Sequence, residues 1–316
     1  MNFDQLFSNF GDLSVQGLAQ GAIYALFALG YTLVYGVLRL LNFAHSEVFM
    51  VGTFGSIVAL NMLGLDQNSP VPAFGAMLFY LLVALLAACL TSGVTAVLLE
   101  RVAYRPLRKR NAPVLTFLIT AIGASVVISE AVGIATRRKP WGAPPLIRQK
   151  ELFTIAGTTI TNLQVFLVLL AIGLMIVLDV FINRTRLGRG VRAIAQDPNT
   201  AALMGVNKDR VIALVFLLGG IMAGAAALMY NLKITGTHFF AGFDLGIKAF
   251  AAAVLGGIGN LRGALLGGLL LGVLEGWGSG LFGTNWTPVV AFVILILVLL
   301  FRPTGLLGES LGRARA

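Results

Sequence analysis

The chain has 316 residues, of which 58% are hydrophobic and 11% are charged, with a formal net charge of +10. Soluble globular domains contain roughly 25% charged residues, and a single soluble core cannot bury so much apolar surface. These values argue against a soluble enzyme, a disordered chain and a nucleic-acid-binding domain. The single cysteine, Cys89, excludes an intramolecular disulfide and a cysteine-based metal site.

Stretches without Asp, Glu, Lys or Arg predict the membrane spans, because a bilayer core of about 30 Å requires about 20 apolar helical residues. Two short stretches, 249–261 and 263–274, predict half-helices or full spans that include Lys248 and Glu275. We expect an all-α polytopic membrane protein with eight to ten transmembrane helices in one domain, residues 1–316. The seven long stretches are 13–38, 48–65, 67–99, 111–129, 152–178, 211–232 and 276–301.

The first residues carry no basic cluster, which argues against a cleavable signal peptide. Residues 1–14 have apolar side chains at helical spacing and predict a short helix at the membrane surface. These side chains are Phe3, Leu6, Phe7 and Phe10.

The distribution of Lys and Arg predicts the orientation, because cytoplasmic loops are enriched in both. With nine segments and the N-terminus outside, the inner loops hold 16 of these residues and the outer loops hold 6. The run from Arg137 to Lys139 is the main exception. This bias places the C-terminus and the long polar loop 183–210 in the cytoplasm.

The sequence lacks the motifs of an ATPase or a metalloenzyme. No phosphate-binding Gly-x-x-x-x-Gly-Lys loop is present, and His45 and His238 are far apart in the sequence. Ser279 stands between two glycines, but no histidine follows that could activate it. We therefore expect no catalytic residue, no metal site and no cofactor in this chain.

The loop 183–210 contains a short helix whose two ends are marked by sequence. Asp197 suits the N-cap, Pro198 suits the first helical position, and Gly205 suits the left-handed residue after the last turn. Residues 201–204 form a small apolar face between these ends. A helix of this length is unstable alone, so we expect it to dock on lipid headgroups or on a cytoplasmic partner.

Motifs spread over most of the chain resemble the LivH-type branched-chain amino acid permeases of ATP-binding-cassette importers. The loop 188–211 resembles the coupling loop of these permeases. After His45 the family usually has Gly-Asp where this chain has Ser46-Glu47, and it often has proline where Arg262 stands, so the finer substrate assignment stays open. The other matching motifs are GAIYAL (21–26), YGVLR (35–39), NFAH (42–45), GIKAF (246–250), AVLGGIGN (253–260) and FRPTGL (301–306).

The resemblance implies an ABC importer permease fold with a cytoplasmic coupling loop, 183–210. It further implies a second permease subunit, two cytoplasmic ATPase subunits that hydrolyse the ATP, a periplasmic substrate-binding protein, and a place in the bacterial inner membrane. The expected ATPase-coupling residues are Arg192, Gln196, Asp197, Pro198, Ala201, Ala202 and Gly205.

Four other polar residues are candidates for a gate or a transport pathway: Asn42, His45, Lys248 and Glu275. Asn42 and His45 lie three residues apart and either cap backbone groups or contribute to a gate. Charged groups inside a membrane are costly and are usually paired, so Lys248 pairs with Glu275 or with Asp244, or else lies on the pathway.

Glycines recur at spacings of four in residues 263–280, and Gly220 and Gly224 repeat this spacing upstream. Such spacing predicts one helical face on which neighbouring backbones approach closely. Two alternative functions remain at this point. One is an ABC permease for urea or short amides; the other is a self-sufficient secondary transporter that couples ions through Lys248, Glu130 or Glu275.

Overall fold

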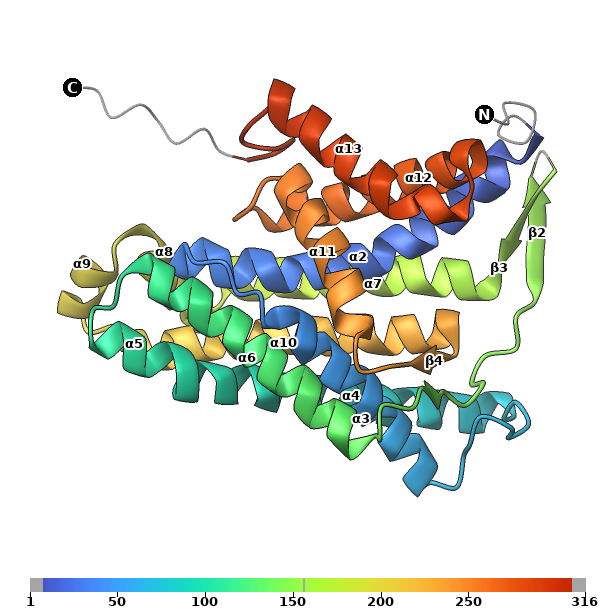
Figure 1. Cartoon of the computed structure of the whole chain (residues 1–316), viewed down its shortest axis with the longest axis horizontal. Helices are drawn as coiled ribbons and strands as arrows, with labels where there is room; N and C mark the ends of the chain where they lie inside the picture. Colours follow the sequence, from blue (N-terminus) through green and yellow to red (C-terminus); the bar gives the residue numbers. More distant parts are fainter. Residues whose placement is uncertain (1–7, 156, 309–316) are drawn as a thin grey trace.

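The computed structural model describes residues 8–155 and 157–308, and in this part of the chain long helices dominate (Figure 1). Two small antiparallel strand pairs, β1 with β4 and β2 with β3, accompany them. The elements in chain order are α2 (Phe10–Leu38), α3 (His45–Met62), α4 (Phe74–Leu99), the π-helix η1 (Glu100–Tyr104), α5 (Arg105–Lys109), α6 (Val114–Ala135), β1 (Trp141–Gly142), β2 (Glu151–Ile155), β3 (Thr158–Thr161), α7 (Asn162–Arg184), α8 (Arg186–Gln196), α9 (Pro198–Leu203), α10 (Lys208–Ile234), β4 (Gly236–Thr237), α11 (Ala241–Gly256), α12 (Leu261–Phe282), the 3-10 helix η2 (Thr284–Trp286) and α13 (Thr287–Phe301).

Seven helical stretches in the described residues are long and apolar enough to cross a membrane. They comprise α2, α4 with its η1–α5 extension, α6, α7, α10, α12 and α13 with η2. The predicted stretches 48–65 and 249–261 correspond to α3 and to the end of α11, which are not among the seven. The chain is therefore a helical, multi-pass membrane protein.

Of the two alternatives predicted for 263–274, the full span that includes Glu275 is confirmed, whereas the predicted final stretch 276–301 is wrong. Helix α12 runs without a break from Leu261 to Phe282, so 263–274 is part of a full-length helix and 276–301 is not a single span. The last span starts after Gly283, whose φ of +88° ends α12. Glu275 does not interrupt the helix because Lys248 on α11 neutralises it.

The basic segments predicted to be cytoplasmic gather at one end of the bundle. Figure 1 shows α5, α8 and α9 together at this end, with the β2–β3 hairpin at the opposite end. The start of α2 lies beside this hairpin, where Asp12 Oδ1 accepts a hydrogen bond from the Thr159 N–H at 3.1 Å. Phe10 begins α2, whereas the other three residues of the predicted surface helix lie outside the described residues.

Glycines bring the central helices into close contact. A Cβ on Gly21 of α2 would lie 2.6 Å from the carbonyl oxygen of Gly268 on α12. A Cβ on Gly220 of α10 would lie 2.8 Å from the Cα of Gly93 on α4. The glycines of α12 use two faces rather than the single predicted face, because Gly267 is directed towards α11 and Gly268 towards α2.

Helices α3 and α11 both begin inside the bundle. His45, the first residue of α3, lies against Gly30 of α2, eight residues before that helix ends at Leu38. At about 1.5 Å per residue, the connection between α2 and α3 turns back by roughly 12 Å. The first turn of α11 meets the same place, since a Cβ on Gly242 would lie 2.8 Å from the carbonyl carbon of Ser46.

The segment after α13 returns to the end of α11. The N–H groups of Leu306 and Leu307 donate to the carbonyl oxygens of Leu255 and Gly256 at 2.8 Å and 3.0 Å. Asn260 Nδ2 donates to the carbonyl oxygen of Leu307 at 2.9 Å. The last carbonyl groups of α11, which lack partners within the helix, are satisfied in this way.

Candidate functional site

The predicted short helix in the loop 183–210 is present, as α9. The Asp197 carboxylate accepts hydrogen bonds from the N–H groups of Asn199 and Thr200 at 2.8 Å and 3.2 Å. The Thr200 hydroxyl also donates to this carboxylate, and these bonds hold the pKa of Asp197 below its usual value. Pro198 occupies the first helical position, and Gly205 has a φ of +86°, as predicted.

The apolar face of α9 points away from the bundle. Leu203 is 87% exposed and Met204 is 80% exposed, although α9 lies at the end of the bundle where the basic segments gather (Figure 1). Among the expected coupling residues only Ala201 is buried. The other six, Arg192, Gln196, Asp197, Pro198, Ala202 and Gly205, are exposed. The geometry suits an apolar protrusion from the basic end of the bundle.

Helix α8 precedes α9 and was not predicted from the sequence. The Thr185 hydroxyl caps it by accepting from the Gly188 N–H at 3.0 Å. Val191 and Ile194 are buried, whereas the arginines point outwards. The i, i+3 spacing of these two apolar residues behind a threonine cap was the available signal, and the surrounding arginines obscured it. The loop 183–210 therefore contains a pair of helices, α8 and α9.

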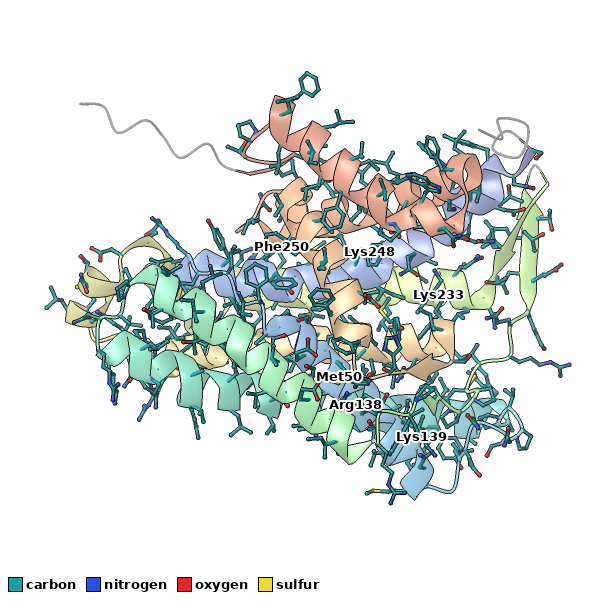
Figure 2. All side chains as sticks on the ribbon, viewed as in Figure 1. Met50, Arg138, Lys139, Lys233, Lys248 and Phe250 are labelled. Carbon is teal, nitrogen blue, oxygen red and sulfur yellow. The ribbon has the colours of Figure 1, made fainter. Side chains whose placement is uncertain are left out.

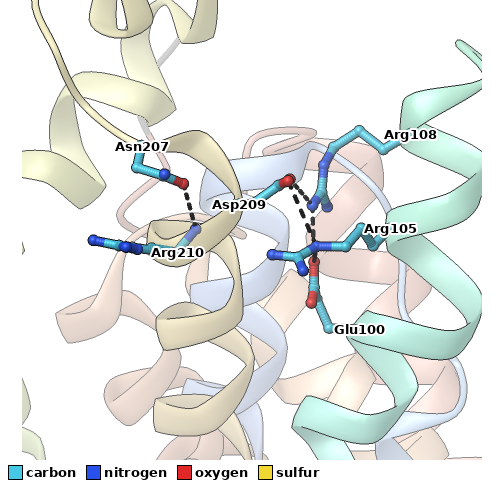
Figure 3. A network of polar contacts seen from close by, with 6 residues as sticks. All are labelled: Glu100, Arg105, Arg108, Asn207, Asp209 and Arg210. Carbon is cyan, nitrogen blue, oxygen red and sulfur yellow. Dashed lines mark hydrogen bonds and ion pairs between the residues drawn. The ribbon is translucent and has the colours of Figure 1, made fainter.

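A partly buried charge network connects this loop to α5 (Figure 3). Glu100 in η1 is fully buried, and its Oε1 lies 2.8 Å from Arg108 Nη2 and 3.7 Å from Arg105 Nε. Both arginines also contact Asp209 in the first turn of α10, at 2.7 Å and 3.6 Å. Asn207 caps the same turn. The network ties the start of α10, directly after α9, to the end of α4.

Asn42 and His45 lie close to the interior start of α3 in different environments. Asn42 Oδ1 accepts a hydrogen bond from the Tyr104 hydroxyl at 3.0 Å. His45 is buried among aromatic rings, with its ring centroid 4.9 Å from that of Tyr31 and 5.4 Å from that of Phe27. His45 Nε2 has no hydrogen-bond partner among the described residues.

Lys248 and Glu275 form an ion pair between α11 and α12. Glu275 is buried, and Lys248 Nζ also lies 5.9 Å from the ring centroid of Tyr24 on α2. Figure 2 shows Lys248 and Phe250 on α11 in the middle of the molecule. The alternative pairing with Asp244 is not observed, because Asp244 is exposed and Glu275 holds the ammonium group.

A third buried acid, Glu47, was not singled out from the sequence. Its Oε1 accepts hydrogen bonds from Ser125 on α6 at 3.1 Å and from Ser46 at 3.3 Å. No cation lies within ion-pair distance of Glu47 in the described part of the chain. The signal that could have identified Glu47 is its place beside Ser46, where the chain departs from the usual family motif.

Comparison with known proteins identifies the class of this membrane protein. Residues 13–299 match the family described as branched-chain amino acid transport system / permease component. The chain belongs to this permease family. As a permease component, it works with separate ATPase and binding-protein components and does not itself hydrolyse ATP.

Individual relatives cover almost the whole permease. The high-affinity branched-chain amino acid transport system permease protein BraD of Pseudomonas aeruginosa is 42% identical over 298 residues, which are 93% of this chain and 94% of BraD. LivH of Escherichia coli K12 is 40% identical over 302 residues, with the same coverage. The fructose import permease FrcC of Rhizobium meliloti is 33% identical over 153 residues, 46% of this chain and 41% of FrcC. Permeases named for different substrates thus share part of this sequence.

Proposed function

We propose that this chain is one of two permease subunits of an ABC importer that carries leucine, isoleucine, valine and related amino acids across a bacterial inner membrane. Two cytoplasmic ATPase subunits and a periplasmic binding protein complete the importer. The similarity to BraD and LivH over 93% of the chain supports this assignment. The observation that carries it is α9, a capped helix that presents Leu203 and Met204 beyond the basic end.

In this proposal, the ATPases bind α9 and displace it, and this displacement moves the permease. A nucleotide can shift the permease between two states only if the ATPases contact those states differently. Leu203 and Met204 supply an apolar contact, and the Asp197 cap keeps the helix rigid. The network of Glu100, Arg105, Arg108 and Asp209 transmits displacement of α9 to α4 and α5.

We also propose that α3 and α11 enter the membrane and raise the seven candidate spans to nine membrane segments. An odd number of segments puts the start of α2 and the end of α13 on opposite sides of the membrane, and the enrichment of Lys and Arg in the inner loops puts the end of α13 in the cytoplasm. The placement of the β2–β3 hairpin beside the start of α2, opposite α9, agrees with this orientation (Figure 1).

The interior starts of α3 and α11 are the proposed gate. His45 and Phe250 both approach Tyr31 here, with ring centroids at 4.9 Å and 6.0 Å. Aromatic rings of this kind form an apolar constriction that suits a branched aliphatic side chain. Asn42 and the pair of Lys248 and Glu275 hold the helices around it in place.

The coupling role is tested by Gly205→Val in the assembled importer. A β-branched residue at positive φ is strained by about 1–3 kcal/mol, which should distort the end of α9 and lower uptake of labelled leucine at least tenfold in cells. Gly64→Val is the matched control, because Gly64 has a φ of +81° and an open surrounding but lies in the turn after α3. Unchanged uptake with Gly205→Val, at equal membrane abundance, contradicts the assignment.

The position of α9 is tested by labelling Met204→Cys in a Cys89→Ala background. A membrane-impermeant maleimide should label this cysteine in inside-out vesicles and not in spheroplasts. Labelling in spheroplasts would put α9 outside and remove its role as an ATPase contact. Leucine uptake by the chain alone in liposomes under an ion gradient would instead support a secondary transporter.

A further inference from the structure

An open cleft with a volume of about 970 Å³ lies at the same end of the bundle as α8 and α9. The ends of α2 and α7, one side of α8, the turn between α11 and α12, and the segment after α13 surround it. We call it the basic cleft. The lining residues used below are Arg39, Asp179, Asn183, Arg192, Ile258 and Arg262.

The charge of the basic cleft is strongly positive. Three arginines, Arg39, Arg192 and Arg262, come from three different helices or their caps, and Asp179 is the one acidic lining residue. Arg262 Nη2 lies 3.2 Å from Asp179 Oδ2, yet the Arg262 side chain remains 70% exposed. Arg192 Nη1 donates to the neutral oxygen Asn183 Oδ1 at 3.0 Å. In the described residues no carboxylate pairs with Arg39 or Arg192, so two positive charges remain without a counter-ion.

The wall of the basic cleft is apolar between these arginines. Ile182, Val254, Ile258 and Leu261 line it together with the charged residues. A small inorganic anion makes use of the arginines alone. A molecule with a phosphate head and hydrocarbon chains makes use of both kinds of surface.

We propose that the basic cleft binds the phosphate group of an anionic phospholipid from the cytoplasmic leaflet. Arginine presents planar, multiple N–H donors that match phosphate oxygens, and basic pockets between helices on the cytoplasmic side are typical sites for anionic headgroups. This inference rests on the proposed function for one point, the cytoplasmic position of α9. It adds a ligand class that the transport role does not require.

A bound lipid at this place would join the coupling loop to the transmembrane helices. Arg192 lies on α8, directly before α9, whereas Arg262 lies in the first turn of α12 and Arg39 caps the end of α2. One phosphate bound by these three side chains holds α8 against α2 and α12. The lipid composition of the leaflet therefore sets how firmly α9 is held.

The test uses the full-length chain, purified with its co-purifying subunits and stripped of lipid. Native mass spectrometry measures the binding of phosphatidylglycerol, of phosphatidylcholine and of diacylglycerol with the same acyl chains. We expect phosphatidylglycerol to bind most tightly, and diacylglycerol, which lacks phosphate, to bind most weakly. Equal binding of all three lipids overturns the proposal.

Two variants locate the lipid. Arg192→Gln and Arg262→Gln each remove one charge-assisted contact, and each should weaken phosphatidylglycerol binding about tenfold. Arg192→Gln is the safer variant because Arg192 bonds only to a neutral side chain. Arg110→Gln is the matched control, since Arg110 is exposed, lies at the end of α5 and does not line the basic cleft. Tight binding by both cleft variants, equal to that of Arg110→Gln, contradicts the site.

A competition experiment separates a lipid from a free anion. Inorganic phosphate at millimolar concentration should not displace phosphatidylglycerol, because it makes no contact with the apolar wall. Full displacement would show a free-phosphate site and overturn the lipid assignment. These readouts need neither uptake nor ATP hydrolysis, so a failure of the lipid proposal and a failure of the coupling role are distinguishable.

Discussion

Two three-helix units of the chain have the same order of a long, a short and a long helix. Their first helices run in opposite directions through the bundle, because α2 leads towards the end with α8 and α9 and α10 leads away from it (Figure 1). In one unit the long helix α2 leads to the short helix α3 and then to α4; in the other, α10 leads to α11 and then to α12. Arg39 after α2 and Thr235 after α10 both take the left-handed conformation, with φ of 53° and 55°. Helix α12 packs along α2, and α4 packs along α10, so each unit completes the other.

The two units differ in the charge that their short helices carry. On α11, Lys248 is neutralised by Glu275 of its own unit. On α3, Glu47 has serine hydroxyls as its only hydrogen-bond partners among the described residues, and His45 Nε2 has none. The α11 side therefore carries an ion pair, whereas the α3 side carries a buried acid that, in the part of the chain that the structure describes, is bonded to hydroxyl groups alone. In the gate proposed above, the α3 side is the one that responds to the transported molecule.

Breaking the ion pair should have the largest effect. Lys248→Met or Glu275→Gln leaves a buried partner without its counterpart and should destabilise the protein by roughly 3–5 kcal/mol. The double variant Lys248→Met with Glu275→Gln should recover much of this loss. The measurement is urea unfolding in detergent, followed by tryptophan fluorescence. A double variant that is no more stable than the single ones would show that the pair is not the stabilising contact.

The same variants test the pathway role of the pair. A purely structural pair affects how much importer is assembled and leaves the KM for leucine unchanged. Normal uptake kinetics in well-assembled Lys248→Met therefore exclude a pathway role, and a raised KM at normal abundance supports one.

Larger side chains at two glycines test whether the two contacts between the units, α2 with α12 and α10 with α4, are equally close-packed. Gly21→Val would force a side chain against the Gly268 carbonyl, and Gly224→Val against the Ala88 carbonyl. Each should cost about 1–3 kcal/mol, measured by the same unfolding assay. Gly173→Ala is the control, because a Cβ there meets no atom within 4 Å. A loss at only one of these two contacts would break the symmetry of the comparison.

A hydrogen bond from Tyr104 in η1, which follows α4, supports the interior start of α3. Tyr104→Phe removes the hydroxyl that donates to Asn42 Oδ1 and should destabilise the protein by about 1 kcal/mol. Asn42→Ala combined with Tyr104→Phe gives a double-variant cycle. Strictly additive losses would mean that the two side chains do not interact.

The smallest effect on stability is expected at Glu47. In Glu47→Gln the amide oxygen can still accept from Ser125, so the free energy of unfolding should change by less than about 1 kcal/mol. If the α3 side responds to the transported molecule, leucine uptake should nevertheless fall. A destabilisation as large as that of Glu275→Gln would remove the proposed difference between the two short helices.

Local features were predictable from the sequence because they depend on neighbouring residues. The caps of α9 at Asp197, Pro198 and Gly205 involve contacts within three residues, and all three were predicted correctly. The gathering of the basic segments α5, α8 and α9 at one end also agrees with the composition, whereas the side of the membrane that this end faces stays a prediction. Family membership was predictable from motifs distributed along the whole chain.

Features that depend on distant residues were not predictable. The charge of Glu275 left a half-helix and a full span open as alternatives for α12, because its partner Lys248 lies on another helix. The network of Glu100 with Arg108 and Asp209 joins residues up to 109 positions apart, and nothing in the sequence pairs them. The contact between Ser46 and Gly242 likewise depends on two chain reversals, one between α2 and α3 and one between α10 and α11. In the sequence, each reversal is visible only as a short loop.

The backbone bonds from Leu306 and Leu307 to α11 have a practical consequence. A chain shortened at Arg302 would leave the final carbonyls of α11 bare, at the very turn that borders the basic cleft. Truncated versions of this permease should therefore keep residues 303–308. These residues supply the hydrogen-bond donors for the last carbonyl groups of α11, a helix that precedes them by some fifty positions.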